Sequence, residues 1–284
     1  MSRPLRALVT NDDGIDSPGL HRLAAAARDS GLEVVVAAPA EQSSGASASI
    51  IAGVESRDRI TVREREIAGL EGLPAYAVGA APALISLIAA HGAFGERPDL
   101  VLSGINHGAN LGQVILHSGT VGAALTAGVN GARGLAVSLD VGLEVEWEIE
   151  RPAAEPHWDT AARVACRVIP FLARQPAGTV LNLNVPDVDD EALAGLRVAP
   201  LAEFGIVQTT MTEHTEGDIR LTVADNSEDP TPGSDAALLA EGYAVVTAIQ
   251  SVRETDRPPL DELAGLAVGG SEGGSGYART SRTA

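Results

Sequence analysis

Residues 5–19, LRALVTNDDGIDSPG, decide the fold of this chain. The first six of them, LRALVT, form an apolar run that predicts a short strand. Helix signals follow at once, because Ser17 is a good N-cap, Pro18 a good first helical residue, and residues 20–30 continue in a helical pattern. The sequence therefore predicts a strand, a turn and a helix, the repeating unit of an α/β sheet.

Two adjacent carboxylates, Asp12 and Asp13, lie in that turn. The turn after a strand of an open α/β sheet is where ligands bind. Adjacent acids repel each other unless they share a proton or a cation, and a hard divalent metal ion is the simplest solution. A plain Asp-Gly turn with solvated carboxylates is the alternative that this motif alone leaves open.

The composition excludes several functional classes. The net charge of −18 and a pI of about 4.6 disfavour a nucleic-acid polymer or an anionic membrane as a partner. All 20 basic residues are Arg, so the chain has no P-loop or Schiff-base lysine and none of the lysine that receiver domains and aspartate-nucleophile phosphatases need. With one cysteine and no apolar leader or membrane-length run, we expect a cytoplasmic protein.

Strand and helix patterns alternate along the first half of the chain, and further elements follow behind it. Further strands are predicted at 33–38, 99–103, 134–139, 179–184 and 243–249, and further helices at 82–90, 121–130 and 158–173. This alternation predicts an α/β fold with a mostly parallel sheet and helices on both faces.

The C-terminal third departs from this pattern. Residues 205–235 are polar with short alternating runs, which predicts a hairpin excursion too long for an ordinary connection. We expect this hairpin to pack against another subunit. Residues 1–265 are expected to form one domain, and residues 266–284, rich in Gly and Ser, a disordered tail.

Two further segments are expected beside the carboxylates. Residues 39–49, PAEQSSGASAS, form either a phosphate- or metal-facing loop or a plain flexible one. Residues 103–108, SGINHG, follow a strand, and residues 117–120, HSGT, enter a helix whose N-terminal N–H groups could cradle a phosphate. Asn106 offers an amide oxygen to a hard cation. Convergence of these groups at one sheet edge indicates metal-assisted phosphate hydrolysis.

Eight stretches of the chain resemble the SurE family of metal-dependent nucleotidases, in the family's order: VTNDDGIDSPG, VVAAPAEQSSGAS, PDLVLSGINHGANLG, SGTVGAAL, LAVSL, HWDTAARVACRVI, LNLNVP and GSDAALLAEGYAVVT. The resemblance implies a Rossmann-like α/β fold with a C-terminal hairpin that forms homodimers or homotetramers. It implies one divalent metal ion per subunit, Mg²⁺ or Mn²⁺, on Asp12, Asp13, Ser44 and Asn106.

The remaining site residues are expected as follows. Those expected to act in catalysis are Asp12, Asn11 and Asn106, and also His117, because it stands directly before the predicted phosphate cradle. Those expected to contact the substrate phosphate are Asn11, Ser44, Gly45, Ser103, Gly104, Ser118, Gly119 and Thr120. The expected reaction is hydrolysis of a nucleoside 5′- or 3′-monophosphate.

Several positions depart from the family pattern. His117 stands where a Tyr is usual, Ala127 where an acidic residue is expected, and residues 80–85, AAPALI, replace a more polar stretch. Two alternatives therefore stay open. One is a phosphatase for a non-standard phosphorylated metabolite, and the other is a catalytically silent homologue that binds metal and phosphate.

Overall fold

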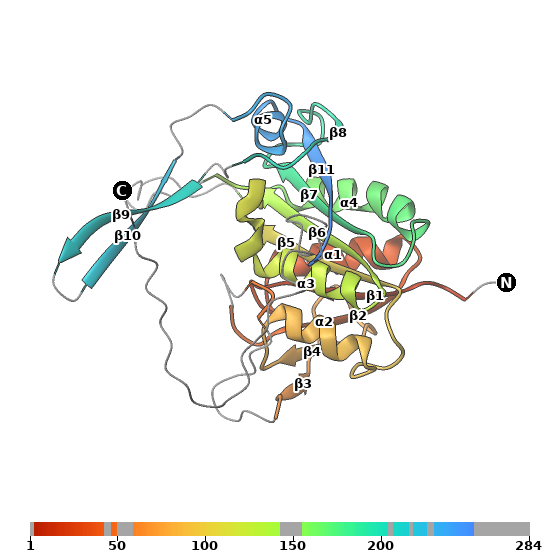
Figure 1. The fold of residues 1–284 in the computed structure, drawn as a ribbon. Helices are drawn as coiled ribbons and strands as arrows, with labels where there is room; N and C mark the ends of the chain where they lie inside the picture. Colours follow the sequence, from red (N-terminus) through yellow and green to blue (C-terminus); the bar gives the residue numbers. More distant parts are fainter. Residues whose placement is uncertain are drawn as a thin grey trace, which may run out of the picture. The chain divides into compact units, whose positions relative to one another are not determined.

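The predicted strand, turn and helix at the start of the chain are confirmed. In the computed structural model, β1 (Arg6–Thr10) ends at the carboxylate turn and α1 (Pro18–Asp29) follows it. Ser17 caps α1 by accepting a hydrogen bond from the Leu20 N–H at 3.3 Å. The structure describes residues 3–42, 47–49, 59–142, 155–203, 207–215, 218–225 and 230–252 (Figure 1).

The sheet of this fold is mixed and mostly parallel. Its nine strands run in the order β3 (Val62–Glu64), β4 (Ala75–Val78), β2 (Glu33–Pro39), β1, β5 (Leu100–His107), β6 (Arg133–Asp140), β7 (Val180–Pro186), β11 (Ala244–Ile249) and β8 (Leu196–Val198). The six strands from β4 to β7 are parallel, whereas β3 and β11 run antiparallel to their inner neighbours. The predicted mostly parallel sheet is confirmed.

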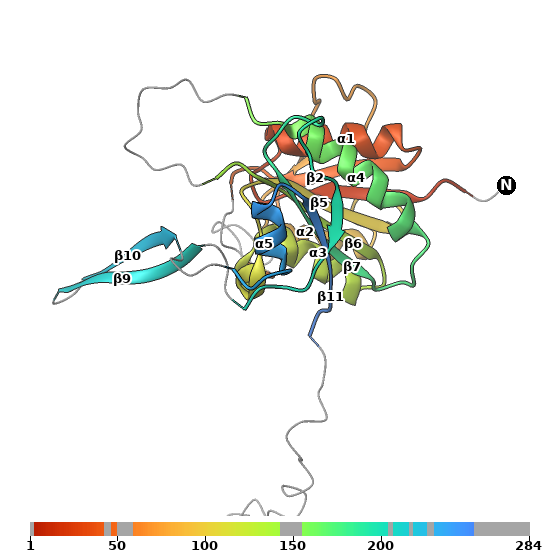
Figure 2. The same ribbon diagram turned by 90° about the horizontal axis from the view of Figure 1, so that it is seen from above.

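Helices cover both faces of the sheet. α1 and α4 (Trp158–Ala173) pack on one face, and α2 (Pro82–Ala90) and α3 (Gly119–Val129) on the other (Figure 2). β1 shows why, because Ala7 and Val9 belong to the apolar cluster with α1 and α4, whereas Leu8 belongs to the cluster with α2. Both faces of this strand are apolar and buried, as is usual in a parallel sheet.

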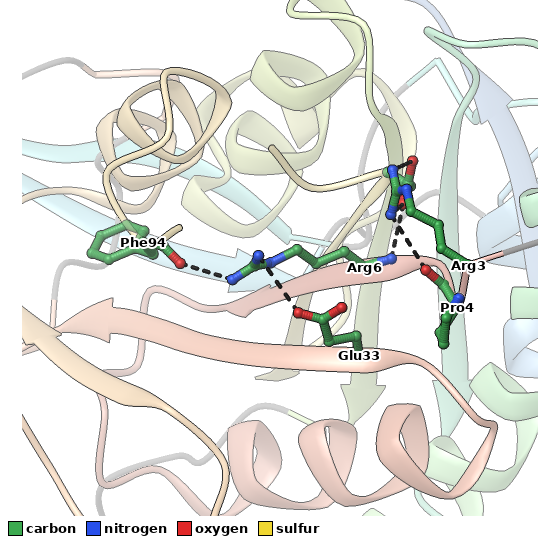
Figure 3. Close-up of polar contacts among 6 residues, drawn as sticks. Arg3, Pro4, Arg6, Glu33 and Phe94 are labelled. Carbon is green, nitrogen blue, oxygen red and sulfur yellow. Dashed lines mark hydrogen bonds and ion pairs between the residues drawn. The ribbon is translucent and has the colours of Figure 1, made fainter. Parts of the chain in front are cut away.

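The amino end of β1 is closed by arginine contacts (Figure 3). The Arg6 guanidinium donates to the Phe94 carbonyl at 2.9 Å and lies 3.5 Å from the Glu33 carboxylate. Asp99 accepts the Arg6 backbone N–H at 2.9 Å and pairs with Arg3. These contacts connect the amino ends of β1 and β2 with the residue before β5, at the end of the strands opposite the carboxylate turn.

The strand β5 is longer than the sequence predicted. The prediction ended this strand at Ser103 and placed Asn106 in a loop, whereas β5 continues through His107 with a register shift against β6 between Ser103 and Asn106. Gly104 permits this path, because its φ is +135° and a Cβ there would clash with the Val137 carbonyl. Asn106 is therefore held by a strand.

The hairpin excursion is also confirmed. β9 (Val207–Thr215) and β10 (Asp218–Asp225) pair antiparallel, and within the described ranges neither joins another strand. α5 (Asp235–Ala240) follows and leads into β11. The expected boundary at 265/266 lies outside the described residues. None of the helices that the structure describes is long and apolar enough to cross a membrane.

Candidate active site

The carboxylate turn after β1 is built on a buried amide. Asn11 is fully buried, and its Nδ2 donates to the Gly14 carbonyl at 3.1 Å and to Ser17 Oγ at 3.0 Å, while the Gly14 N–H donates to its Oδ1 at 3.2 Å. The side chain thus joins the turn to the N-cap of α1. Asn11, predicted to contact phosphate, shapes the loop that presents the carboxylates.

Asp12 lies against the N-terminus of α3. The Thr120 hydroxyl donates a hydrogen bond to Asp12 Oδ1, and the Thr120 backbone N–H also donates to this carboxylate. Because Gly119 has no side chain, there is space for the Asp12 carboxylate beside it; a Cβ at this residue would lie 2.8 Å from Asp12 Oδ2. Burial raises the pKa of Asp12, and the hydrogen bonds from Thr120 oppose that rise. Gly119 and Thr120, predicted to cradle phosphate, hold Asp12 in this structure.

Asp13 is the less satisfied of the two carboxylates. Its Oδ2 is buried and finds no hydrogen-bond donor among the described residues. Burial, together with the nearby charge of Asp12, raises the pKa of Asp13 to about 6, although the His107 backbone donates a hydrogen bond to it. A buried carboxylate oxygen that accepts no hydrogen bond is available to bind a cation, which would satisfy its charge.

Asn106 brings a third oxygen to this point. Its Nδ2 donates to the Gly108 carbonyl at 2.8 Å, which directs Oδ1 towards Thr120 Oγ1 at 3.3 Å and so towards Asp12. The described residues contain no group of three or more His, Cys, Asp or Glu side chains that could hold a metal. A cation here would therefore rely on two carboxylates and neutral oxygens. Ser44 and Gly45 lie outside the described residues.

These groups border an open pocket of about 430 Å³. Its lining residues come from the turn after β1, the segment after β2, the end of β5 and the stretch from there through the 3₁₀ helix η1 (Gly112–His117) to the N-cap of α3: Asp12, Asp13, Gln42, Asn106, His107, Asn110, Val114, His117 and Ser118. The volume suits a small ligand. His107 and His117 are the side chains in this described lining that can carry a positive charge.

The pocket contains predicted and unpredicted residues. His117 and Ser118 line it as the sequence predicted, and Ser118 also caps α3 by accepting the Val121 N–H at 3.1 Å. Asn110 and Val114 were not predicted, because neither belongs to a local motif with chemistry of its own. His107 also lines the pocket without being among the predicted site residues, and its ring centroid lies 5.8 Å from that of Trp158.

Ser103 and Gly104 lie behind the pocket and are not among its lining residues. Ser103 is fully buried beside Thr10 on β1, and among the described residues neither hydroxyl has a hydrogen-bond partner. The predicted contact of Ser103 and Gly104 with phosphate stays a prediction, although neither residue borders the pocket.

Two departures from the family pattern occur together. Ala127 is buried in the apolar cluster beneath α2, and this cluster also contains Ala80, Leu84 and Ile85. An acidic side chain at position 127 would be buried against apolar side chains here, which is unfavourable for a charge. These changes therefore alter core packing, whereas His117 is the departure that lines the pocket.

The fold and the site define an α/β protein with an oxygen-donor pocket at the carboxyl ends of its parallel strands. Residues 7–206 match the family described as survival protein SurE. The chain belongs to this family.

Sequence and structural similarity to other SurE proteins extends over nearly the whole chain. The chain is 36% identical over 270 residues to 5′-nucleotidase SurE of Rubrobacter xylanophilus, covering 93% of this chain and 98% of the relative. It is 34% identical to 5′/3′-nucleotidase SurE of Edwardsiella ictaluri, covering 87% and 90%. The crystal structure of the SurE protein from Aquifex aeolicus superposes with a TM-score of 0.67 at 25% identity, covering 91% and 98%.

Proposed function

We propose that this protein hydrolyses nucleoside 5′- or 3′-monophosphates with the help of one divalent metal ion per subunit. The observation that carries the proposal is the Asp12–Asp13 pair, whose buried Asp13 Oδ2 lacks a donor among the described residues beside an open pocket. The names of the relatives, 5′-nucleotidase and 5′/3′-nucleotidase, supply the substrate class.

The residues present fit a hard cation. Asp12, Asp13 and Asn106 offer carboxylate and amide oxygens, the ligands that Mg²⁺ and Mn²⁺ prefer, and the family resemblance adds Ser44, which follows the pocket residue Gln42 by two positions. When bound, such an ion neutralises phosphate charge and makes water a stronger nucleophile. Burial and the nearby charge of Asp12 raise the pKa of Asp13, and both effects are those that a bound cation would offset.

Side chains of the protein would then orient the attacking water, bind the phosphate and supply a proton. Thr120 fixes Asp12 through its hydroxyl and backbone N–H, so Asp12 can orient the attacking water without moving. His117 and Ser118 line the same pocket, where they can bind phosphate oxygens, and His117 can supply a proton to the leaving oxygen. Asn11 keeps the turn in shape from behind.

The test is release of inorganic phosphate from a panel of nucleoside 5′- and 3′-monophosphates, with Mn²⁺ or Mg²⁺ and with EDTA. Asp13→Asn should lower kcat by about 10²-fold or more, as loss of a comparable electrostatic group does. The matched control is Asp16→Asn in the same loop, since Asp16 is exposed and pairs with Arg65 at 2.8 Å. Equal activity of the two variants, or full activity in metal-free protein, would refute the proposal.

The panel also decides between the alternatives. Turnover of p-nitrophenyl phosphate without turnover of any nucleotide would favour a specialised phosphatase for another phosphorylated metabolite. Metal binding without turnover of either substrate would identify a silent binding protein. The His117 departure is the feature of the pocket that keeps the first alternative in the test.

We also propose that the β9–β10 hairpin mediates assembly into a homodimer or homotetramer. In the described part of the chain the two hairpin strands form ladder hydrogen bonds with each other and with no other strand. A two-stranded hairpin on its own is only marginally stable in water. Light scattering at micromolar concentration should give a mass of at least two subunits. A monomer would contradict this part of the proposal.

A further inference from the structure

A second buried carboxylate, Asp235, lies outside the pocket. It is the first residue of α5 and is completely buried. Its Oδ2 accepts the Gly112 N–H at 2.9 Å, and its Oδ1 accepts the N–H groups of Ala202 and Ala236, each at 2.8 Å. Three backbone N–H groups from three segments thus donate to the Asp235 carboxylate, which is separate from the carboxylate pair of the pocket.

Gly112 is the residue at which Asp235 meets the pocket. It begins η1, the 3₁₀ helix that carries Val114 and His117 and leads to Ser118. The next residue, Gln113, donates its N–H to the Ala202 carbonyl at 3.2 Å, and the Ala202 N–H is itself held by Asp235. The first turn of η1 is therefore attached to Asp235 twice, once directly and once through Ala202.

The residues just before η1 have an anchor of their own. Asn182 and Asn184 on β7 each donate to the Asn110 carbonyl at 2.8 Å, and the Asn110 N–H donates to Asn184 Oδ1 at 2.7 Å. Asn110 Nδ2 donates to Ser138 on β6 at 2.8 Å. Loss of the Asp235 contact would consequently loosen η1 while Asn110, and Asn106 before it, stay attached to the sheet.

We propose that Asp235 is a positioning residue of the active site, which holds η1 so that His117 and Ser118 face the bound phosphate. This inference rests on the proposed phosphatase function for its kinetic consequence, but not for its structural one. Asp235 touches no lining side chain in the described contacts and acts through the Gly112 N–H. Its effect should therefore fall on substrate binding at η1 and leave the metal-binding residues alone.

The experiment compares Asp235→Asn with a matched control, Thr247→Val. The asparagine keeps the shape but places a donor where one of the carboxylate oxygens accepted. Thr247 is also buried, and its hydroxyl donates to the Ala199 carbonyl at 2.8 Å, a hydrogen bond that does not involve η1. Both changes remove a buried hydrogen bond, so their melting temperatures measure the purely structural cost.

For Asp235→Asn we expect kcat/KM on a nucleoside monophosphate to fall at least tenfold, mainly through a higher KM. Misplacing a binding group by about 1 Å can cost about 10²-fold. Binding of Mn²⁺ alone, measured by calorimetry, should stay within about twofold of wild type, because a factor of two is only about 0.4 kcal/mol. Amide hydrogen exchange of residues 112–118 should accelerate in this variant and not in Thr247→Val.

Identical kcat/KM and identical exchange of residues 112–118 in the two variants would overturn the inference. A parallel loss of Mn²⁺ affinity would overturn it as well, since the damage would then reach beyond η1. If wild type hydrolyses no nucleotide, the proposed function fails, while exchange still decides whether Asp235 holds η1. Should Asp235→Asn not fold, Asp235→Ser, which keeps one acceptor at the start of α5, carries the same comparison.

Discussion

Replacing Asp13 with Asn should stabilise the metal-free protein at neutral pH while it destroys activity. Burial and the charge of Asp12 raise the pKa of Asp13 from 3.8 to about 6. The folded protein therefore binds this proton more tightly than the unfolded chain does, and ionising Asp13 destabilises the fold. An amide at the same place carries no charge and keeps an oxygen for the His107 N–H.

The size of the effect follows from the pKa. A rise of about 2 units corresponds to about 3 kcal/mol if fully expressed, and solvent screening of the partly exposed side chain reduces it to about 1–2 kcal/mol. For a chain of this length that is about 2–3 °C in melting temperature, from an unfolding entropy of about 2.1 cal/mol/K per residue. The gain should be complete above about pH 6, shrink as the pH falls towards 4, and vanish below that, where Asp13 is protonated in both states.

The assay is thermal unfolding of wild type, Asp13→Asn and the exposed-loop control Asp16→Asn in EDTA from pH 4 to 8. Added Mn²⁺ should reverse the order at pH 7.5, because a ligand at 100 times its Kd stabilises the folded wild type by about 2.7 kcal/mol. A variant that melts below wild type in EDTA at pH 7.5, or a difference that does not change with pH, would refute the reasoning.

Three further predictions concern residues 117–120, which lead into and begin α3. Gly119→Ala would place a Cβ 2.8 Å from Asp12 Oδ2, so kcat/KM should fall by about 10²-fold, and an unchanged value in steady-state kinetics would show that Asp12 can move aside. Thr120→Val should lower kcat at least tenfold and Thr120→Ser much less, because serine keeps the hydroxyl that donates to Asp12; equal losses would point to packing instead. His117→Tyr should change the ranking of nucleotide substrates without changing Mn²⁺ affinity, and an unchanged ranking would mean that His117 does not contact the nucleoside.

Local motifs are the part of this structure that the sequence predicts well. The strand, turn and capped helix of residues 5–30 depend on neighbours in the chain, and they occur where predicted. The strands β3 and β8 have three residues each and β4 has four, too few for a period to be read. β5 was cut short because Gly104 reads as a breaker, whereas its conformation is supported by a close approach to β6 that only the folded sheet creates.

The candidate site divides in the same way. Asp12, Asp13, Asn106 and His117 stand in motifs whose chemistry is visible in a few letters. The contacts that hold these residues cannot be predicted from a few letters of sequence, because they join distant parts of the chain. Asn110 contacts a residue of β7 that is more than 70 positions away, and Gly112 contacts Asp235, which is 123 positions away. Likewise, only the folded core shows that Ala127 and residues from the 80–85 stretch lie in one apolar cluster.

The two segments that flank the β9–β10 hairpin end on the hydrogen-bond network that carries η1. On one side Ala202 donates to Asp235, and on the other the Asp235 N–H donates to the Pro200 carbonyl. A subunit contact that orders these flanks would restrict η1 as well, so assembly and nucleotide binding would be thermodynamically linked. Reciprocity then requires nucleotide to strengthen subunit association by the same factor by which association strengthens nucleotide binding. The concentration at which the oligomer dissociates would in that case report on the occupancy of the pocket.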